Sequence, residues 1–180
     1  TTLDNTNQPI RNAFNKKATP FECGAGHIQP NFAIDPGLVY DLTTTDYLNF
    51  LCASGYNQDL LKLFVNLRCP YSCSKSYRIE DFNHPSITVH HPASKPINVT
   101  RTVTNVGPPS TYVVNTHGPK GIKVVVQPCS LTFKKTGEKK KFQVILLAIN
   151  GAPRHGLPLF GNLSWTDGKH RVTSPITILP

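Results

Sequence analysis

Histidine, cysteine and serine are the residue types in this sequence that could carry out nucleophilic or acid–base chemistry. The 180-residue chain contains seven histidines and five cysteines. A hydrolytic triad needs a nucleophile exposed at a sharp turn, within hydrogen-bonding reach of a histidine that a carboxylate orients. The sequence contains no Gly-x-Ser-x-Gly or His-Glu-x-x-His motif, and no phosphate-binding loop or dinucleotide fingerprint. It therefore predicts neither a complete active site nor a bound cofactor.

His27 is one candidate for a general base, because Glu22 and Asp35 lie near it in the sequence. A histidine beside glycines, with no nucleophile nearby, is more often a hydrogen-bonded structural residue than a catalyst. We therefore expect His27 to have a structural role. His155 and His170 are expected at the surface, in a loop and on a strand respectively.

The cysteines could bind zinc or form disulfides. The spacing of Cys69 and Cys73 falls within the range found in zinc sites, but a closed site needs two further ligands. His84 does not supply a second knuckle, and His90 and His91 would point to opposite faces of a strand. Disulfides are the alternative and require an oxidising compartment. Because five is an odd number, at least one cysteine is unpaired or bonds outside this chain.

Two Asn-x-Ser/Thr sequons are compatible with such a compartment. They begin at Asn98 and Asn162. Both asparagines are candidate N-glycosylation sites, since the acceptor in secreted proteins is an asparagine in this pattern.

The formal net charge is +9, but the basic residues do not form a nucleic-acid footprint. The densest basic stretch, Lys134 to Lys141, has no aromatic or arginine residues interleaved with it. We interpret it as a solvated hairpin turn that protects a strand edge, with polyanion binding as the minor alternative. The sequence also lacks an apolar run near the ~20 residues of a membrane span. Nucleic acid and membrane are therefore not expected partners.

From residue 86 onward, apolar and polar residues alternate with the period of a β-strand. Strands are predicted near 86–90, 97–105, 111–116, 122–127, 131–133, 140–148, 160–166 and 170–178. Glycine, proline and asparagine turn signals separate them, including Asp167-Gly168 as a short hairpin. This pattern predicts an antiparallel β-sandwich, with Trp165 near its core.

The first half of the chain has a different pattern. Asp35-Pro36-Gly37 predicts a turn, because proline presets φ and glycine accepts a left-handed conformation. Thr44 or Thr45 could cap an amphipathic helix through residues 46–53, and Asn57 could cap a second short helix.

Several segments, in this order, have the pattern of one family. They are Gly24-Ala25-Gly26-His27, Asp35-Pro36-Gly37-Leu38-Val39-Tyr40-Asp41, Asp46-Tyr47-Leu48-Asn49-Phe50-Leu51-Cys52, Asp81-Phe82-Asn83-His84-Pro85-Ser86-Ile87, Arg101-Thr102-Val103-Thr104-Asn105-Val106-Gly107 and Gly161-Asn162-Leu163-Ser164-Trp165-Thr166-Asp167-Gly168. This ordered set resembles the C-terminal part of plant subtilisin-like serine proteases of the cucumisin-like group, with His84 where a tyrosine is usual. The resemblance covers nearly the whole chain.

The resemblance implies a mainly β chain of three parts. Residues 1–41 would be the C-terminal remnant of the α/β subtilisin-like peptidase domain, residues 42–85 a helical, disulfide-bearing linker, and residues 86–180 a fibronectin type III-like sandwich. Because the first part lacks its partners, we expect residues 1–41 to be poorly packed, swapped, or held by another chain. The absence of methionine and the start at Thr1 are interpreted as signs of a processed piece or fragment.

The resemblance also implies a secreted, glycosylated serine endopeptidase that is extracellular, in the apoplast or cell wall, or vacuolar. The Asp/His/Ser triad and the asparagine of the oxyanion hole would lie upstream of Thr1, so no catalytic, cofactor or metal residue is assigned in this chain. The implied partners are the remainder of the protease chain and, through it, protein or peptide substrates. The alternative is an independent, non-enzymatic β-sandwich module, such as a seed or cell-wall binding or defence protein.

The family further implies a disulfide from Cys52 to a cysteine just before the sandwich. Both Cys69 and Cys73 are available, and Cys69 is slightly favoured. A closed loop of this size would contribute about 3 kcal/mol in the chain-entropy model. Cys23 and Cys129 would then be free thiols or form a bond that the family does not imply.

Overall fold

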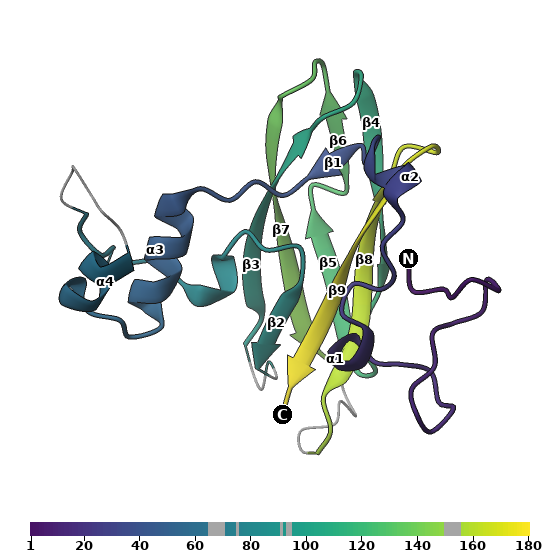
Figure 1. Ribbon diagram of the computed structural model, residues 1–180, viewed down its shortest axis with the longest axis horizontal. Coiled ribbons are helices and arrows are strands. Elements are labelled where there is room, and N and C mark those ends of the chain that lie inside the picture. Colours follow the sequence, from purple (N-terminus) through teal and green to yellow (C-terminus); the bar gives the residue numbers. More distant parts are fainter. Residues whose placement is uncertain (65–70, 75, 91, 93–94, 150–155) are drawn as a thin grey trace.

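The computed structural model describes residues 1–64, 71–74, 76–90, 92, 95–149 and 156–180. Two β-sheets are stacked face to face (Figure 1). The helices of residues 44–64 lie on one side of them, and the N-terminal segment, with its two short helices, lies on the other. The strands are β1 (Leu38–Val39), β2 (Ile87–His90), β3 (Ile97–Asn105), β4 (Ser110–His117), β5 (Ile122–Gln127), β6 (Ser130–Phe133), β7 (Lys139–Ala148), β8 (Leu159–Thr166) and β9 (Arg171–Leu179). The helices are α1 (Pro20–Cys23), α2 (Pro30–Ala33), α3 (Thr44–Ala53), α4 (Gln58–Phe64) and the 3₁₀ helix η1 (Ile79–Asp81).

The two sheets have the orders β1-β3-β7-β5 and β2-β9-β8-β4-β6. The prediction of a mainly β sandwich is confirmed, and each strand predicted from residue 86 onward is present with ends shifted by at most one residue. One edge departs from the antiparallel pattern, since β2 pairs with β9 in parallel. β2 arrives from the linker rather than from a hairpin, so its direction is not constrained by a tight turn.

The inward-facing residues of both sheets form one apolar core. Trp165 is fully buried, as predicted, and its ring meets that of Phe142 edge-on with centroids 5.1 Å apart. Val99 and Val103 on β3 are also fully buried. Asn98, which immediately precedes Val99, is exposed. Burial alternates with period two along β2, β6 and β7. The alternation is interrupted in β8 and β9, where Ser164 and Thr177 are buried together with their inward-facing neighbours.

Strand β1 places the end of the N-terminal segment in the sandwich. Leu38 pairs with Asn105 of β3 and is 3% exposed within the common core. The Tyr40 hydroxyl lies 2.7 Å from Ser174 Oγ on β9. The range 1–41, predicted as a peptidase remnant, thus ends in residues that pack as part of the sandwich.

The lysine-rich stretch does not form the hairpin turn that the sequence predicts. β6 and β7 belong to different sheets, so residues 134–138 cross from one sheet to the other. Glu138 accepts a hydrogen bond from the Lys134 N–H at 2.6 Å and pairs with Lys140 at 3.2 Å. Lys139 pairs with Asp41 at 3.2 Å. Part of the positive charge is therefore balanced locally.

The helices of the linker begin at polar caps. Thr43, rather than Thr44 or Thr45, caps α3: its side chain accepts the Asp46 N–H, and the Asp46 carboxylate accepts the Thr43 N–H at 2.7 Å. This reciprocal capping box satisfies two backbone donors at once. Asn57 caps α4, as predicted, by accepting the Leu60 N–H at 2.9 Å.

Candidate functional site

In the part of the chain that the structure describes, His27 and His84, two of the sequence candidates for chemistry, do not form a common site. His27 makes its described hydrogen bonds through its backbone, with its N–H donating to Thr1 O at 2.6 Å. His84 lies beside Ser86, with Nδ1 2.8 Å from the hydroxyl oxygen. Among the described residues, no group of three or more His, Cys, Asp or Glu side chains could hold a metal ion. His91 and His155 lie outside the described residues.

Among the histidines that the structure describes, His170 is the one whose side chain has polar contacts with several different residues. The prediction of a surface position is wrong, since its side chain is only 8% exposed. The cause is the turn at Asp35, which folds over the β8–β9 hairpin and covers the imidazole. The signals for both turns are present in the sequence, but the contact between them spans 134 positions between Asp35 and Lys169.

We call Asp35, Tyr112, Asp167, Lys169 and His170 the histidine cluster. The imidazole Nδ1 lies 2.9 Å from Asp167 Oδ2, and Nε2 lies 3.1 Å from Asp35 Oδ1. The second contact lacks the alignment of a hydrogen bond, so its attraction is ionic. Lys169 Nζ donates to the other oxygen of Asp35 at 2.5 Å, and the Tyr112 hydroxyl lies 3.5 Å from Nδ1.

The charges of this cluster support one another. The hydrogen bond to Asp167, followed by the contact with Asp35, raises the pKa of His170 above 6.5. Burial on its own would raise the pKa of Asp167, but hydrogen bonds from His170 and its neighbours lower it below the usual range. The hydrogen bond from Lys169 lowers the pKa of Asp35. Burial raises the pKa of Tyr112, which keeps its hydroxyl neutral. The two carboxylates therefore favour the protonated, imidazolium form of His170.

Gly37 lets the Asp35 turn approach the cluster closely. Its φ is +75°, a region that residues with a Cβ rarely adopt. A Cβ at this position would lie 2.6 Å from the Tyr112 hydroxyl and 2.8 Å from His170 Cγ. The glycine of the Asp35-Pro36-Gly37 turn is therefore required by both conformation and space.

A second polar cluster joins the linker to β3, and sequence reasoning did not assign it. Arg101 is 4% exposed and donates to the carbonyl oxygens of Glu80 (2.6 Å), His84 (2.9 Å) and Ser86 (3.1 Å). Burial lowers the pKa of its guanidinium, but the ordinary value is so high that the group stays charged. One Arg101 side chain thus holds three backbone positions in the segment that leads into β2.

Two further linker side chains bond to the edge of β3. The Asn83 amide accepts the Thr102 N–H at 2.7 Å and donates to the Thr102 carbonyl at 2.9 Å. Asp81 accepts the Thr100 N–H at 2.7 Å. These side chains occupy backbone groups that an unpaired strand edge would otherwise expose.

The linker disulfide joins Cys52 on α3 to Cys73, with their Cα atoms 5.7 Å apart. The preference for Cys69 is therefore wrong, and Cys69 itself lies outside the described residues. Residues just before Cys73 are tied to the helices: the Tyr71 hydroxyl donates to Asn49 at 2.7 Å, and Gln58 donates to the Tyr71 carbonyl at 2.7 Å.

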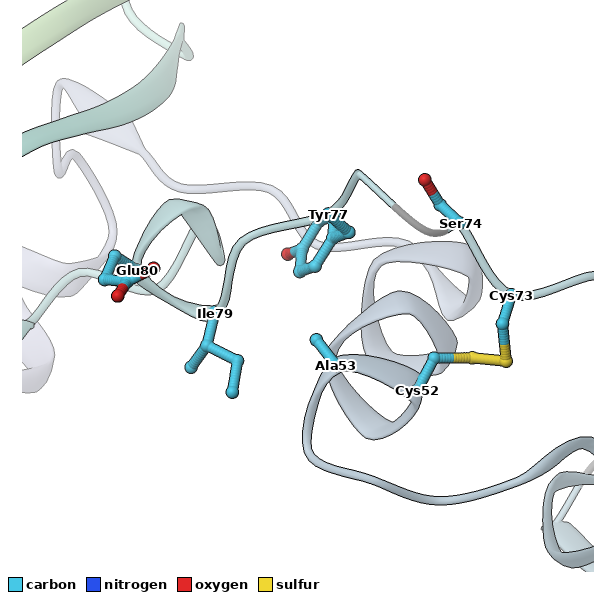
Figure 2. Close-up of a pocket in the computed structure, with 7 residues that line it drawn as sticks. All are labelled: Cys52, Ala53, Cys73, Ser74, Tyr77, Ile79 and Glu80. Atoms are coloured by element: carbon cyan, nitrogen blue, oxygen red, sulfur yellow. A yellow bond between two sulfur atoms is a disulfide. The ribbon is translucent and has the colours of Figure 1, made fainter.

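Figure 2 shows a shallow hollow between α3 and the chain that follows this disulfide. Cys52 and Ala53 line it from the helix, and Tyr77 and Ile79 line it from the segment leading to β2. Burial raises the pKa of the Tyr77 hydroxyl, so it stays protonated. The lining holds no pairing of a nucleophile with a base, and it does not resemble a catalytic cleft. Cys23 and Cys129 are free thiols.

The two sequons lie on different faces of the sandwich. Asn98 is exposed on the outer face of β3, directly opposite Ile145 of β7. Asn162 is half-buried in β8, between His117 of β4 and Pro175 of β9. On the same strand as Asn162, the Phe160 ring meets Phe21 of the N-terminal segment, with centroids 5.4 Å apart.

Comparison with known proteins identifies one family for the sandwich and one group of relatives for the chain. A family model described as a fibronectin type-III domain matches residues 81–178. A subtilisin-like protease of Glycine max is 55% identical over 179 residues, covering 99% of this chain and 22% of that protein. A subtilisin-like protease of Arabidopsis thaliana is 49% identical over 99% of this chain and 23% of its own length. A protein of Arabidopsis thaliana named as a CO₂-response secreted protease is 40% identical over 89% of this chain and 22% of its own length. The chain therefore spans less than a quarter of the length of these relatives.

Proposed function

Since this chain belongs to the fibronectin type-III domain family and corresponds to the C-terminal part of plant subtilisin-like proteases, we propose that it is the C-terminal segment of such a serine endopeptidase. Its role is to support the peptidase part, and it carries no catalytic residue of its own. The observation that carries the proposal is the 55% identity to a subtilisin-like protease over 99% of this chain. An independent sandwich module is not favoured, because the match includes the segment and the linker before the sandwich.

The exposed apolar side chains of the N-terminal segment support the proposal that another part of the protease covers this segment. None of residues 1–36 is buried. Five large apolar side chains in this stretch are between 61% and 86% exposed, namely Phe14, Phe21, Ile28, Phe32 and Ile34. So many large apolar side chains exposed within one short segment support a surface that another protein part covers. The occupant that we propose is the remainder of the peptidase part.

The proposed compartment is extracellular or vacuolar, reached through the secretory pathway. A disulfide between Cys52 and Cys73 is compatible with such oxidising conditions. The name of one relative describes it as secreted. In the part of the chain that the structure describes, no helix is long and apolar enough to cross a membrane.

Co-expression with the N-terminal remainder of the Glycine max relative tests the supporting role. We expect the 180-residue chain to co-purify with this remainder and to raise its peptidase activity, because the apolar side chains of residues 14–34 become covered. The chain alone should not react with a fluorophosphonate. Stoichiometric labelling of the chain alone, or full activity of the remainder without it, would contradict the proposal.

A pair of matched variants locates the contact. Phe32→Ser with Ile34→Ser should weaken co-purification, because both side chains are more than 70% exposed within the N-terminal segment. Leu157→Ser is the control, since Leu157 is 87% exposed but lies before β8. Equal loss of association in both variants would show that general surface apolarity, rather than this segment, drives the contact.

We further propose N-glycans at Asn98 and Asn162. After expression in a secretory plant host, enzymatic release of N-glycans should lower the mass of the wild-type chain. Thr100→Ala should remove the contribution of Asn98, whereas Thr100→Ser keeps the sequon and should leave it unchanged. Asn162→Gln tests the second site in the same way. A wild-type mass that release does not change would refute both sites.

A further inference from the structure

We propose that the histidine cluster is a pH-sensitive latch that fastens the N-terminal segment to the sandwich. The biological consequence rests on the proposed function, because that segment would carry the contact with the peptidase part. In the described chain, residue 35 lies just before β1, and residues 167–170 form the turn between β8 and β9. The latch thus joins the end of the segment to a hairpin of the sandwich.

The two ring nitrogens of His170 contact carboxylates from different parts of the chain. Nδ1 faces Asp167, which lies in the same hairpin and also accepts the backbone N–H of His170 at 2.7 Å. Nε2 faces Asp35, which comes from the other segment. Only the doubly protonated ring presents a proton to both carboxylates. Neutral imidazole can still donate from Nδ1 to Asp167, but its Nε2 then has neither a proton nor positive charge beside the Asp35 carboxylate.

The remaining groups around His170 do not replace that proton. Tyr112 of β4 is buried and neutral, and its hydroxyl is 3.5 Å from Nδ1 rather than near Nε2. Ser110 donates to Asp167 at 3.0 Å and so stabilises the carboxylate. Lys169 pairs with Asp35, but its side chain is 72% exposed, so solvent and salt screen this ion pair. Loss of the Nε2 proton therefore weakens the contact that crosses between the two segments.

The direction of the pH effect follows from the pKa shifts. The folded-state pKa of His170 is raised, so its contribution to stability is complete below 6.5 and is lost as the pH rises through the folded-state value. The pKa values of Asp35 and Asp167 are lowered, so their contributions are present above 3.8 and are lost as the pH falls through their folded-state values. The contact between the N-terminal segment and the sandwich is thus most stable between pH 3.8 and pH 6.5, in mildly acidic solution.

Amide hydrogen exchange on the full 180-residue chain tests the latch without any partner, so its outcome is separate from that of the co-purification experiment. The probe is the Val106 N–H, which donates to the Gly37 carbonyl at 2.9 Å and reports on the docked turn. After correction for intrinsic exchange, we expect loss of protection at Val106 as the pH rises above 6.5, while amides between β3 and β7 stay protected. Protection at Val106 that does not change with pH would overturn the proposal.

Three variants separate the latch from a purely structural role. His170→Gln should remove the pH dependence at Val106, because glutamine does not titrate. His117→Gln, at an exposed histidine of β4, should keep it. Asp35→Asn preserves the shape of the turn and should lower the pKa of His170. This pKa can be measured from the NMR chemical shift of the His170 ring proton as the pH is varied. An unchanged pKa in Asp35→Asn, or an unchanged pH dependence in His170→Gln, would overturn the latch.

Discussion

Replacing Arg101 with methionine is expected to lower the free energy of unfolding by about 3 kcal/mol. Methionine keeps much of the buried apolar stem but donates no hydrogen bond. The carbonyls of Glu80, His84 and Ser86 then lose their donor, and each loss of a hydrogen bond to a charged group costs on the order of 1 kcal/mol or more. These partners are backbone carbonyls, so a second substitution cannot remove them. Replacing a whole buried ion pair by apolar side chains can raise stability, but that gain is not possible here because the carbonyls remain.

Equilibrium denaturation of the 180-residue chain measures this effect, with Arg101→Lys and Arg171→Met as comparisons. Lysine supplies a point charge without the planar fork of arginine, so it should reach only part of the carbonyl set and give an intermediate loss. Arg171 is exposed on β9, and its replacement should change stability by less than about 0.5 kcal/mol. If Arg101→Met were as stable as the wild type, water rather than Arg101 would have to satisfy those carbonyls.

The positions of the strands could be predicted from the sequence because the inward face of each sheet packs into one apolar core. Val99 and Val103 alternate with polar neighbours along β3, and Trp165 lies on the buried face of β8. This alternation reports local burial, but it carries no information about which strand lies beside which. The stretch from Lys134 to Lys141 therefore looks like a hairpin in the sequence, although it connects the two sheets.

The capping residue of α3 can be identified from its spacing to an acidic residue. Three consecutive threonines, Thr43, Thr44 and Thr45, could each begin a helix. Only Thr43 has an acidic residue three positions later, Asp46, which completes the reciprocal capping box. The spacing to Asp46 therefore distinguishes the threonines, whereas residue type alone does not.

The histidine cluster and the Arg101 contacts could not be predicted in the same way. Asp35-Pro36-Gly37 and Asp167-Gly168 are visible as turns, but their contact depends on the packing of β1 against β3. The partners of Arg101 are backbone carbonyls, which have no residue-type signature. Polar groups that meet through the fold, rather than through spacing along the chain, become visible only in three dimensions.

Removing the linker disulfide by Cys52→Ser with Cys73→Ser is expected to destabilise the linker by about 3 kcal/mol. The bond closes a loop between residues 21 positions apart, and the chain-entropy model assigns a stabilisation of this size to such a loop. The remaining attachments of α3 are modest, such as the contact between the Phe50 and Phe82 rings, whose centroids are 4.7 Å apart. The loss should therefore appear first in α3 and α4, as faster amide exchange and faster proteolysis, while the sandwich keeps its protection.

The other cysteines provide the controls for this experiment. Cys23→Ser with Cys129→Ser removes two free thiols and should leave the exchange of α3 and α4 unchanged. Cys69→Ser should leave the bond between Cys52 and Cys73 in place, which peptide mapping of the unreduced protein can show. A map that links Cys52 to Cys69 would contradict the observed pairing. Linker exchange that stays the same after the disulfide is removed would instead show that helix packing and the Tyr71 hydrogen bonds alone hold the linker together.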